Sequence, residues 1–359
     1  MSGALISLVA KGVQDAYLSD NGGTSLFSIK YNRHTNFAQA PKRLPVTSGS
    51  VSSNETCVIP LSRLGDLINC VWLEGDDLVD NLGGTIFELH IGGQTVDTQT
   101  YEFMSEIWQV YLADSASKAR TINNVISKSN NKFFPLHFFF CDNGLFLPLV
   151  AMQYTEAEIH IKWGPSVDSV QNLKAYGNFV YLDTDEREKM AQKEMSMIIT
   201  QTQKVLYSSD QELDLAYFNH PVKALFFGLN AISSDLLTDN WTFENMDMYL
   251  NGKSFLEEMS PTYFHTVQGY YHTKYGVIAY DTTQNTPEYT RYFMYSFALD
   301  ASSFAPTGTC NFSRLDNAKM ILKNIVRGSD QMDSPLNIYA ASYNILRFKM
   351  GIAGILFSN

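Results

Sequence analysis

Short runs in which apolar and polar residues alternate fill most of the chain, and Gly, Asn, Asp and Pro separate these runs. Alternation with a period of two predicts half-buried β-strands. In the clearest run, residues 156–163, polar residues stand between the apolar positions Ala157, Ile159, Ile161 and Trp163. This pattern is typical of antiparallel sheets that turn one face to a core and the other to water.

A helical period is found in two places. Residues 101–112 carry an apolar stripe on one face, formed by Tyr101, Met104, Trp108 and Tyr111 or Leu112. A second, shorter helix is predicted after Asp183 or Thr184, because either residue is a good N-cap and acidic residues follow in the first turn. We expect the first helix to cover a sheet edge that would otherwise be open to pairing.

Two tight hairpins are predicted where Gly92-Gly93 and Asn251-Gly252 stand between apolar runs. Type I′ turns need positive φ angles at both central residues, which these residue types tolerate. The runs around the hairpins also align in order: Cys70–Leu73 with Leu225–Gly228, Phe138–Phe140 with Tyr295–Phe297, and the strand at Ala157 with the strand at Ala318. We therefore predict one β-unit of about 160 residues that is used twice.

The fold class follows from the number and spacing of these strands. Each half holds about eight short strands, and the alternation of strand and helix typical of parallel sheets is missing. We predict an all-β double jelly roll, that is, two tandem eight-stranded antiparallel sandwiches with one or two short helices. The predicted domains are an N-terminal arm at residues 1–22, a first jelly roll at residues 23–190 and a second at residues 191–359.

Composition narrows the classes of function. The net charge is −11, from 26 basic and 37 acidic residues, and this disfavours direct binding of nucleic acid, which depends on cationic contacts. The cysteines, Cys57, Cys70, Cys141 and Cys310, form no CxxC pair, so we expect reduced thiols in a cytosolic protein. The sequence also predicts no signal peptide and no membrane-spanning segment, because its apolar runs are too short.

Candidate chemistry is sparse. Glu156 and His160 lie on one predicted strand face, but the HxH and HExxH spacings of metal sites are missing. No GxSxG motif and no phosphate-binding glycine loop is present. We therefore predict no catalytic residue, no metal site and no cofactor, and we do not expect an enzyme. Three possible glycosylation sites, at Asn54, Asn240 and Asn311, would matter only in a secreted chain.

Several stretches resemble the major capsid proteins of nucleocytoplasmic large DNA viruses, the family that includes those of phycodnaviruses and iridoviruses. The most specific stretch is Pro306–Asn317, which reads PTGTCNFSRLDN. Other similar stretches are Leu8–Leu18, Tyr31–Ala38, Glu88–Gln94, Pro135–Phe140, Gly144–Tyr154, Tyr181–Arg187, Phe218–Pro221, Tyr295–Leu299 and Leu336–Arg347. This chain is shorter than well-known members, whose long loops build a tower on the outer surface, so a receptor or glycan role for a tower is not expected.

The resemblance implies a viral structural protein of the virion capsid that is assembled in the host cytoplasm. It implies a homotrimer, a pseudohexameric capsomer that tiles an icosahedral shell and contacts neighbouring capsomers and minor capsid or penton proteins. The N-terminal arm would lie at the capsomer base, facing minor proteins or an internal viral membrane. Two alternatives stay open: a minor capsid component, and a tandem jelly-roll module that binds glycans.

The candidate interface residues follow from these expectations. Asn311, Arg314 and Asp316 form a dense polar turn, in which Arg314 either pairs with a nearby carboxylate or locks adjacent jelly rolls or subunits. Two further pairs are Trp108 with Tyr111, interpreted as core or as a capsomer contact, and Asp15 with Tyr17 in the arm.

Overall fold

The computed structural model describes residues 12–17, 33–46, 49–61, 64–120, 132–141, 144–207, 212–229, 241–275, 280–281, 286–287, 292–327 and 335–358. Residues 1–36 and 37–359 form two separate compact units. The described part of the first unit contains one short 3₁₀ helix, η1 (Gln14–Tyr17). Every helix among the described residues is too short or too polar to cross a membrane.

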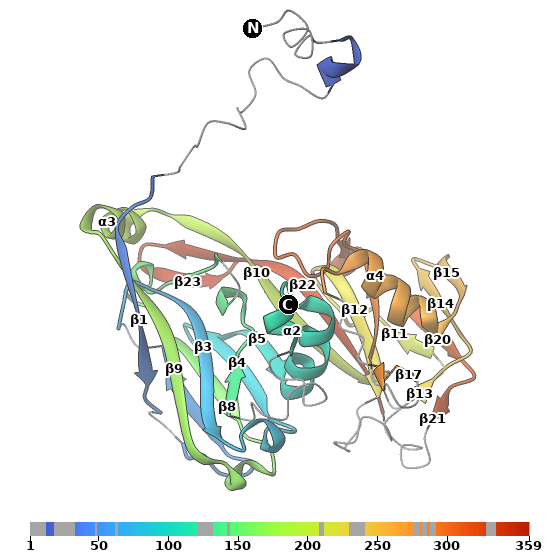
Figure 1. Cartoon of the computed structure of the whole chain (residues 1–359), viewed down its shortest axis with the longest axis horizontal. Helices are drawn as coiled ribbons and strands as arrows, with labels where there is room; N and C mark the ends of the chain where they lie inside the picture. Colours follow the sequence, from blue (N-terminus) through green and yellow to red (C-terminus); the bar gives the residue numbers. More distant parts are fainter. Residues whose placement is uncertain are drawn as a thin grey trace, which may run out of the picture. The chain divides into compact units, whose positions relative to one another are not determined.

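The first half of the larger unit holds two antiparallel sheets (Figure 1). One has the order β1 (Phe37–Leu44), β9 (Gln171–Leu182), β3 (Leu67–Asp76) and β6 (Phe133–Pro135), and β7 (Leu147–Pro148) also pairs with β3. The other has the order β2 (Thr56–Pro60), β8 (Ala157–Lys162), β4 (Ile86–Ile91) and β5 (Gln94–Thr100). We call this pair of sheets the first sandwich.

The second half repeats the arrangement. One sheet has the order β10 (Met195–Tyr207), β22 (Leu336–Lys349), β12 (Pro221–Leu229) and β18 (Tyr292–Ser296), with β19 (Cys310–Asn311) beside β12 and β23 (Ile352–Ile355) beside β22. The other has the order β11 (Glu212–Asp214), β20 (Ala318–Lys323), β14 (Asn245–Leu250) and β15 (Lys253–Met259). We call this pair the second sandwich. Two small ladders join β13 (Trp241–Thr242) to β21 (Val326–Arg327) and β16 (Tyr280–Asp281) to β17 (Thr286–Pro287).

The strand order is the same in both sandwiches. When the eight main strands of each half are numbered along the chain, one sheet has the order 1-8-3-6 and the other 2-7-4-5. This is the jelly-roll order, in which two Greek keys close over a common core. The predicted all-β double jelly roll is therefore confirmed in its topology.

Helices occupy few positions, and two of those positions correspond in the repeat. After strand five of the first sandwich come the π-helix η3 (Phe103–Leu112) and α2 (Ala116–Arg120). After strand five of the second come η7 (Tyr263–Val267) and α4 (Gln268–His272), a helical segment that the sequence analysis did not predict. The predicted helix between the halves is α3 (Thr184–Gln192), where the Asp183 carboxylate caps the amide of Thr184 at 2.8 Å. Five single turns are η2 (Val79–Asn81), η4 (Phe139–Cys141), η5 (Leu149–Ala151), η6 (Val167–Ser169) and η8 (Phe312–Arg314).

The predicted hairpins are confirmed by the backbone. The φ angles are +61° and +77° at Gly92 and Gly93, and +50° and +72° at Asn251 and Gly252, the signs that type I′ turns require. The strand at Ala157 corresponds to the strand at Ala318, as predicted, because each residue pairs with the last residue before its hairpin.

A β-bulge at the same place in both sandwiches fixes how the repeats correspond. Strand three slips against strand eight between Ile68 and Cys70 in the first sandwich and between Val222 and Ala224 in the second. Cys70 therefore corresponds to Ala224, one residue from the match to Leu225 that the sequence suggested. The match of Phe138–Phe140 to Tyr295–Phe297 is also displaced, because Phe134 and Phe293 hold the corresponding ladder positions.

Each sandwich encloses its own apolar core. The second core is rich in aromatic rings and is centred on Phe227, which contacts Trp241, Phe243, Phe264 and Phe293. The first core includes side chains from the other half: Ile199, Leu346 and Phe348 of the long strands β10 and β22, and Ala353 of the short strand β23. Strands β10 and β22 thus extend past the second sandwich and complete the first core.

Candidate functional site

A cluster of buried apolar side chains from both halves lies between the two sandwiches. One face of η3 packs on the outer face of β12, β18 and β22, where Phe226, Tyr339 and Met294 are fully buried. The Tyr111 hydroxyl donates to the Tyr292 carbonyl at 2.7 Å, which anchors the helix to the sheet. The predicted helix over 101–112 therefore packs between the two jelly rolls and joins them; we call the helix η3 in this position the wedge.

Trp108 and Tyr111 are buried in this wedge. Their exposed fractions are 7% and 2%, and the Trp108 ring stacks on His137 at 3.6 Å between centroids. Burial lowers the pKa of His137 to about 3, so this ring is neutral at physiological pH. Both residues belong to the core between the sandwiches of one chain.

Asp97, at the strand edge between the sandwiches, is a buried carboxyl that the sequence analysis missed. It is 3% exposed, accepts the backbone N–H of Thr202 at 2.7 Å, and accepts the Gln99 side-chain amide at 2.6 Å. Desolvation by burial raises the pKa of Asp97 to about 7. Beside it, the Gln201 amide donates to the Val96 carbonyl. An acidic residue in a polar strand carries no sequence signal that it will be covered by a neighbouring sandwich.

The polar turn at residues 311–316 lies against the second hairpin. The Asn311 side chain accepts the amide of Ser313 at 3.1 Å and caps η8. The amide of Asp316 donates to the Asn251 side chain at 3.2 Å. Arg314 is exposed, and no carboxylate in the described part of the chain pairs with it. The guanidinium therefore faces solvent from a turn that is itself fixed.

The remaining predicted residues lie on the surface or in the arm. Asp15 is in η1, where its carboxylate accepts the amide of Gly12 at 2.7 Å, and Tyr17 is the last residue of the same turn. Asn54 and Asn311 are exposed, whereas Asn240 lies outside the described residues.

Two half-buried histidines of the first sandwich, His90 and His160, pair with carboxylates. His90 and His160 stack with their centroids 4.0 Å apart, and each ring nitrogen bonds a carboxylate on its own strand, Glu88 at 2.9 Å and Glu158 at 3.0 Å. An open hollow of about 450 Å³ adjoins them, lined by Tyr154, Thr155 and Glu156 among others. The described residues contain no group of three side chains placed to hold a metal ion.

Comparison with known proteins identifies the family. A family model described as large eukaryotic DNA virus major capsid protein matches residues 186–354, and one described as major capsid protein N-terminus matches residues 25–76 and 77–183. The major capsid protein of Pyramimonas orientalis virus is 31% identical over 402 residues, with all of both chains covered. The chain belongs to the family of major capsid proteins of large eukaryotic DNA viruses. The resemblance found in the sequence is confirmed.

Other members and solved structures agree with this family and fold. The major capsid protein of Paramecium bursaria Chlorella virus 1 is 27% identical over 450 residues, with all of both chains covered. Its capsid structure superimposes with a TM-score of 0.76 at 23% identity, covering 93% of this chain and 100% of that one. The Faustovirus major capsid protein reaches a TM-score of 0.66 at 9% identity, covering 94% of each chain. The protein is thus a double jelly-roll structural protein of a virion capsid.

Proposed function

We propose that three copies of this protein form a pseudohexameric capsomer that tiles the facets of an icosahedral shell. The observation that carries the proposal is the identical strand order of the two sandwiches within one chain. Three chains then supply six similar sandwiches, so a three-fold assembly presents nearly six-fold contacts to its neighbours. Weak contacts between capsomers gain strength from their number.

Exposed apolar side chains support an assembling surface. Tyr270, Leu299 and Met350 are each more than three-quarters exposed. Contiguous exposed apolar groups mark an interaction surface, and here Tyr270 and Tyr271 lie side by side with their ring centroids 4.9 Å apart. Subunit contacts in obligate oligomers are large and apolar, which fits their presence here.

The mass of the protein in solution tests this function. Light scattering is expected to give about 122 kDa, three times the chain mass of 40.5 kDa, and the mass should persist on dilution because obligate interfaces are strong. A stable monomer would contradict the proposal and favour the tandem jelly-roll module that binds glycans. Glycan-array binding by such a monomer would then decide for that alternative.

Arg314 is expected to stabilise the contact between subunits. Its guanidinium is exposed on a fixed turn, the arrangement from which arginine makes bidentate pairs across interfaces. Arg314→Ala should raise the protein concentration at which half the trimer dissociates by about tenfold. Because the dissociation constant of a trimer varies with the square of that concentration, this corresponds to about 2.7 kcal/mol per trimer. Arg347→Ala is the control, because Arg347 already pairs with Glu194 of its own chain. An Arg314→Ala trimer as stable as the wild type would remove the role.

The N-terminal arm and the external partners complete the proposal. We propose that the arm lies at the capsomer base, facing minor capsid or penton proteins or an internal membrane, in shells assembled in the host cytoplasm. The net charge of −11 supports partners other than nucleic acid. Deleting residues 2–20 should leave trimers intact, since the arm and the sandwiches are separate units, but should block shell assembly in cells that express the other capsid proteins. Normal shells from the truncated protein would contradict this.

A further inference from the structure

The contact between the two sandwiches of one chain has a helix side and a sheet side. Its helix side is η3 and its sheet side is the outer face of β12, β18 and β22. Because the fold is repeated, each side has a counterpart: η7 and α4 of the second sandwich, and the outer face of β3, β6 and β9 of the first. The question is whether these counterparts are covered within the chain.

The counterpart helix is left uncovered. Met104 of η3 and Phe264 of η7 point into their own cores, which aligns the two helical segments. At the positions that follow, Val110 and Tyr111 are 4% and 2% exposed, whereas the aligned Tyr270 and Tyr271 are 79% and 70% exposed. The aromatic face of α4 is thus the counterpart of a face that η3 buries.

The counterpart sheet face is also left open. The shared bulge aligns the cross-strand pair Phe226 and Tyr339 with Trp72 and Tyr176. The first pair is fully buried beneath η3, whereas Trp72 and Tyr176 are half-exposed and stack on each other at 5.7 Å. The surrounding positions differ in the same way: Ala224, Met294 and Ala341 are buried, and the aligned Cys70, Pro135 and Asn178 are half-exposed.

We propose that η7 and α4 of one copy pack on the outer face of the β1-β9-β3-β6 sheet of a second copy. This proposal rests on the proposed capsomer. The contact reproduces the η3 seat, with Tyr270 and Tyr271 over Trp72 and Tyr176 of the neighbouring copy. It is heterologous, since each copy offers the helix to one neighbour and the sheet to the other, so it closes a ring. Three such contacts alternate with the three internal ones.

The strand edges beside the helices also differ between the contact within the chain and the proposed contact between copies, and the two edges differ together. Within the chain, Thr202 of β10 donates its amide to Asp97 of β5. The aligned positions are Pro41 of β1, which has no amide hydrogen, and Leu256 of β15, which has no carboxylate. Both partners of the hydrogen bond are therefore replaced together, and an apolar contact takes their place.

Charges next to this pair are complementary. Leu256 is followed on β15 by Glu257 and Glu258, and Pro41 is followed on β1 by Lys42 and Arg43. All four charged residues are exposed. Opposite charges on the two edges favour the β15 to β1 pairing of different copies and disfavour pairing of like edges.

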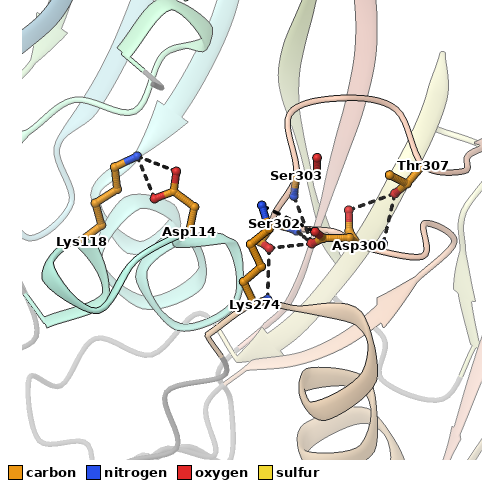
Figure 2. Close-up of polar contacts among 7 residues, drawn as sticks. All are labelled: Asp114, Lys118, Lys274, Asp300, Ser302, Ser303 and Thr307. Atoms are coloured by element: carbon orange, nitrogen blue, oxygen red, sulfur yellow. Dashed lines mark hydrogen bonds and ion pairs between the residues drawn. The ribbon is translucent and has the colours of Figure 1, made fainter. Parts of the chain in front are cut away.

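The helix face is held in place before any contact forms. The amide of Ala301 donates to the His272 carbonyl at the end of α4 at 2.8 Å. Figure 2 shows how the loop that contains Ala301, after β18, is fixed: the Asp300 carboxylate accepts the amides of Ser302 and Ser303 at 3.0 and 3.1 Å and lies 3.8 Å from the Lys274 ammonium. A preorganised face binds at lower entropic cost.

Single charge insertions test the seat. Tyr271→Asp and, as a second variant, Tyr270→Asp should raise the concentration for half-dissociation of the trimer by at least about 100-fold, because interface aromatics are frequent hot spots. Both side chains are largely exposed, so folding should be unaffected, as near-UV circular dichroism will check. Trp72→Asp should do the same from the sheet side. Tyr154→Asp, an equally exposed tyrosine elsewhere, should leave the trimer intact.

Mixing the variants tests the head-to-tail geometry. In a mixture, the Trp72→Asp protein supplies an intact helix face and the Tyr271→Asp protein supplies an intact sheet face. The two should therefore form a dimer of about 81 kDa, twice the chain mass. Neither variant alone should do so. If the wild type and the Tyr271→Asp variant are both trimeric, the proposed contact is wrong but the capsomer proposal is unaffected. A monomeric wild type overturns both.

Discussion

Replacing Phe227 by alanine is expected to lower the free energy of unfolding by about 3–5 kcal/mol. Phe227 has no exposed surface and lies 5.5 to 6.5 Å, centroid to centroid, from four other aromatic rings. Its removal loses the buried area of the ring and leaves a cavity among aromatic side chains that β13, β18 and η7 hold in place and that cannot collapse into it. Chemical denaturation followed by tryptophan fluorescence measures the effect, since Trp241 adjoins the cavity.

The matched control is Phe357→Ala. Phe357 is 55% exposed, so the same change in volume should cost less than about 0.5 kcal/mol. Equal losses at Phe227 and Phe357 would show that the aromatic cluster of the second sandwich does not hold that sandwich together.

Asp97→Asn is expected to remove a pH dependence of stability that spans about three pH units. The folded pKa of about 7 lies above the unfolded value of about 3.9, so Asp97 contributes stability below about pH 4 that is lost as the pH rises to about 7. The full span corresponds to about 4 kcal/mol. Asparagine keeps an oxygen for the Thr202 amide but cannot ionise. The stability of the variant relative to the wild type should therefore rise between pH 4 and pH 8, measured by guanidinium unfolding at each pH.

Asp247→Asn is the control with the opposite sign. Hydrogen bonds from the Lys323 ammonium and from the amide of Glu258 hold the pKa of Asp247 below its usual range. Its contribution is present at neutral pH and is lost as the pH falls through the folded pKa. The loss of stability of the asparagine variant relative to the wild type should thus be largest at neutral pH. A wild-type stability that is flat from pH 4 to pH 8, with Asp97→Asn parallel to it, would contradict the assignment of Asp97.

Much of the fold is visible in the sequence because the sandwiches use local signals. The hairpin at Gly92-Gly93 needs positive φ angles that few residues tolerate, and the strand at Ala157 alternates between core and water. The repeat is visible for the same reason. The sequence alignment slipped by a residue at β12, where eight of the nine positions are buried on both faces and no alternation marks the register.

The contacts between the sandwiches could not be predicted in this way. The segment of η7 and α4 has apolar residues at helical spacing, Tyr263, Val267, Tyr270 and Tyr271, but this pattern does not show that Tyr270 and Tyr271 are exposed. Asp97 reads as an ordinary polar position of a half-exposed strand until β10 covers it. The burial of Asp97 depends on a contact with Thr202, 105 positions away, and a single sequence carries no record of such a contact.

The extension of β22 and β23 into the first core has a consequence for biosynthesis. Leu346, Phe348 and Ala353 fill that core, but the ribosome makes them more than 160 residues after the last strand of the first sandwich, β9. Domains generally fold in the order in which they are synthesised. Here the core of the earlier domain is complete only after the hairpin of β22 and β23 has been made. A chain released early would lack a sealed first sandwich, so only full-length translation products would offer both faces of the ring to their neighbours.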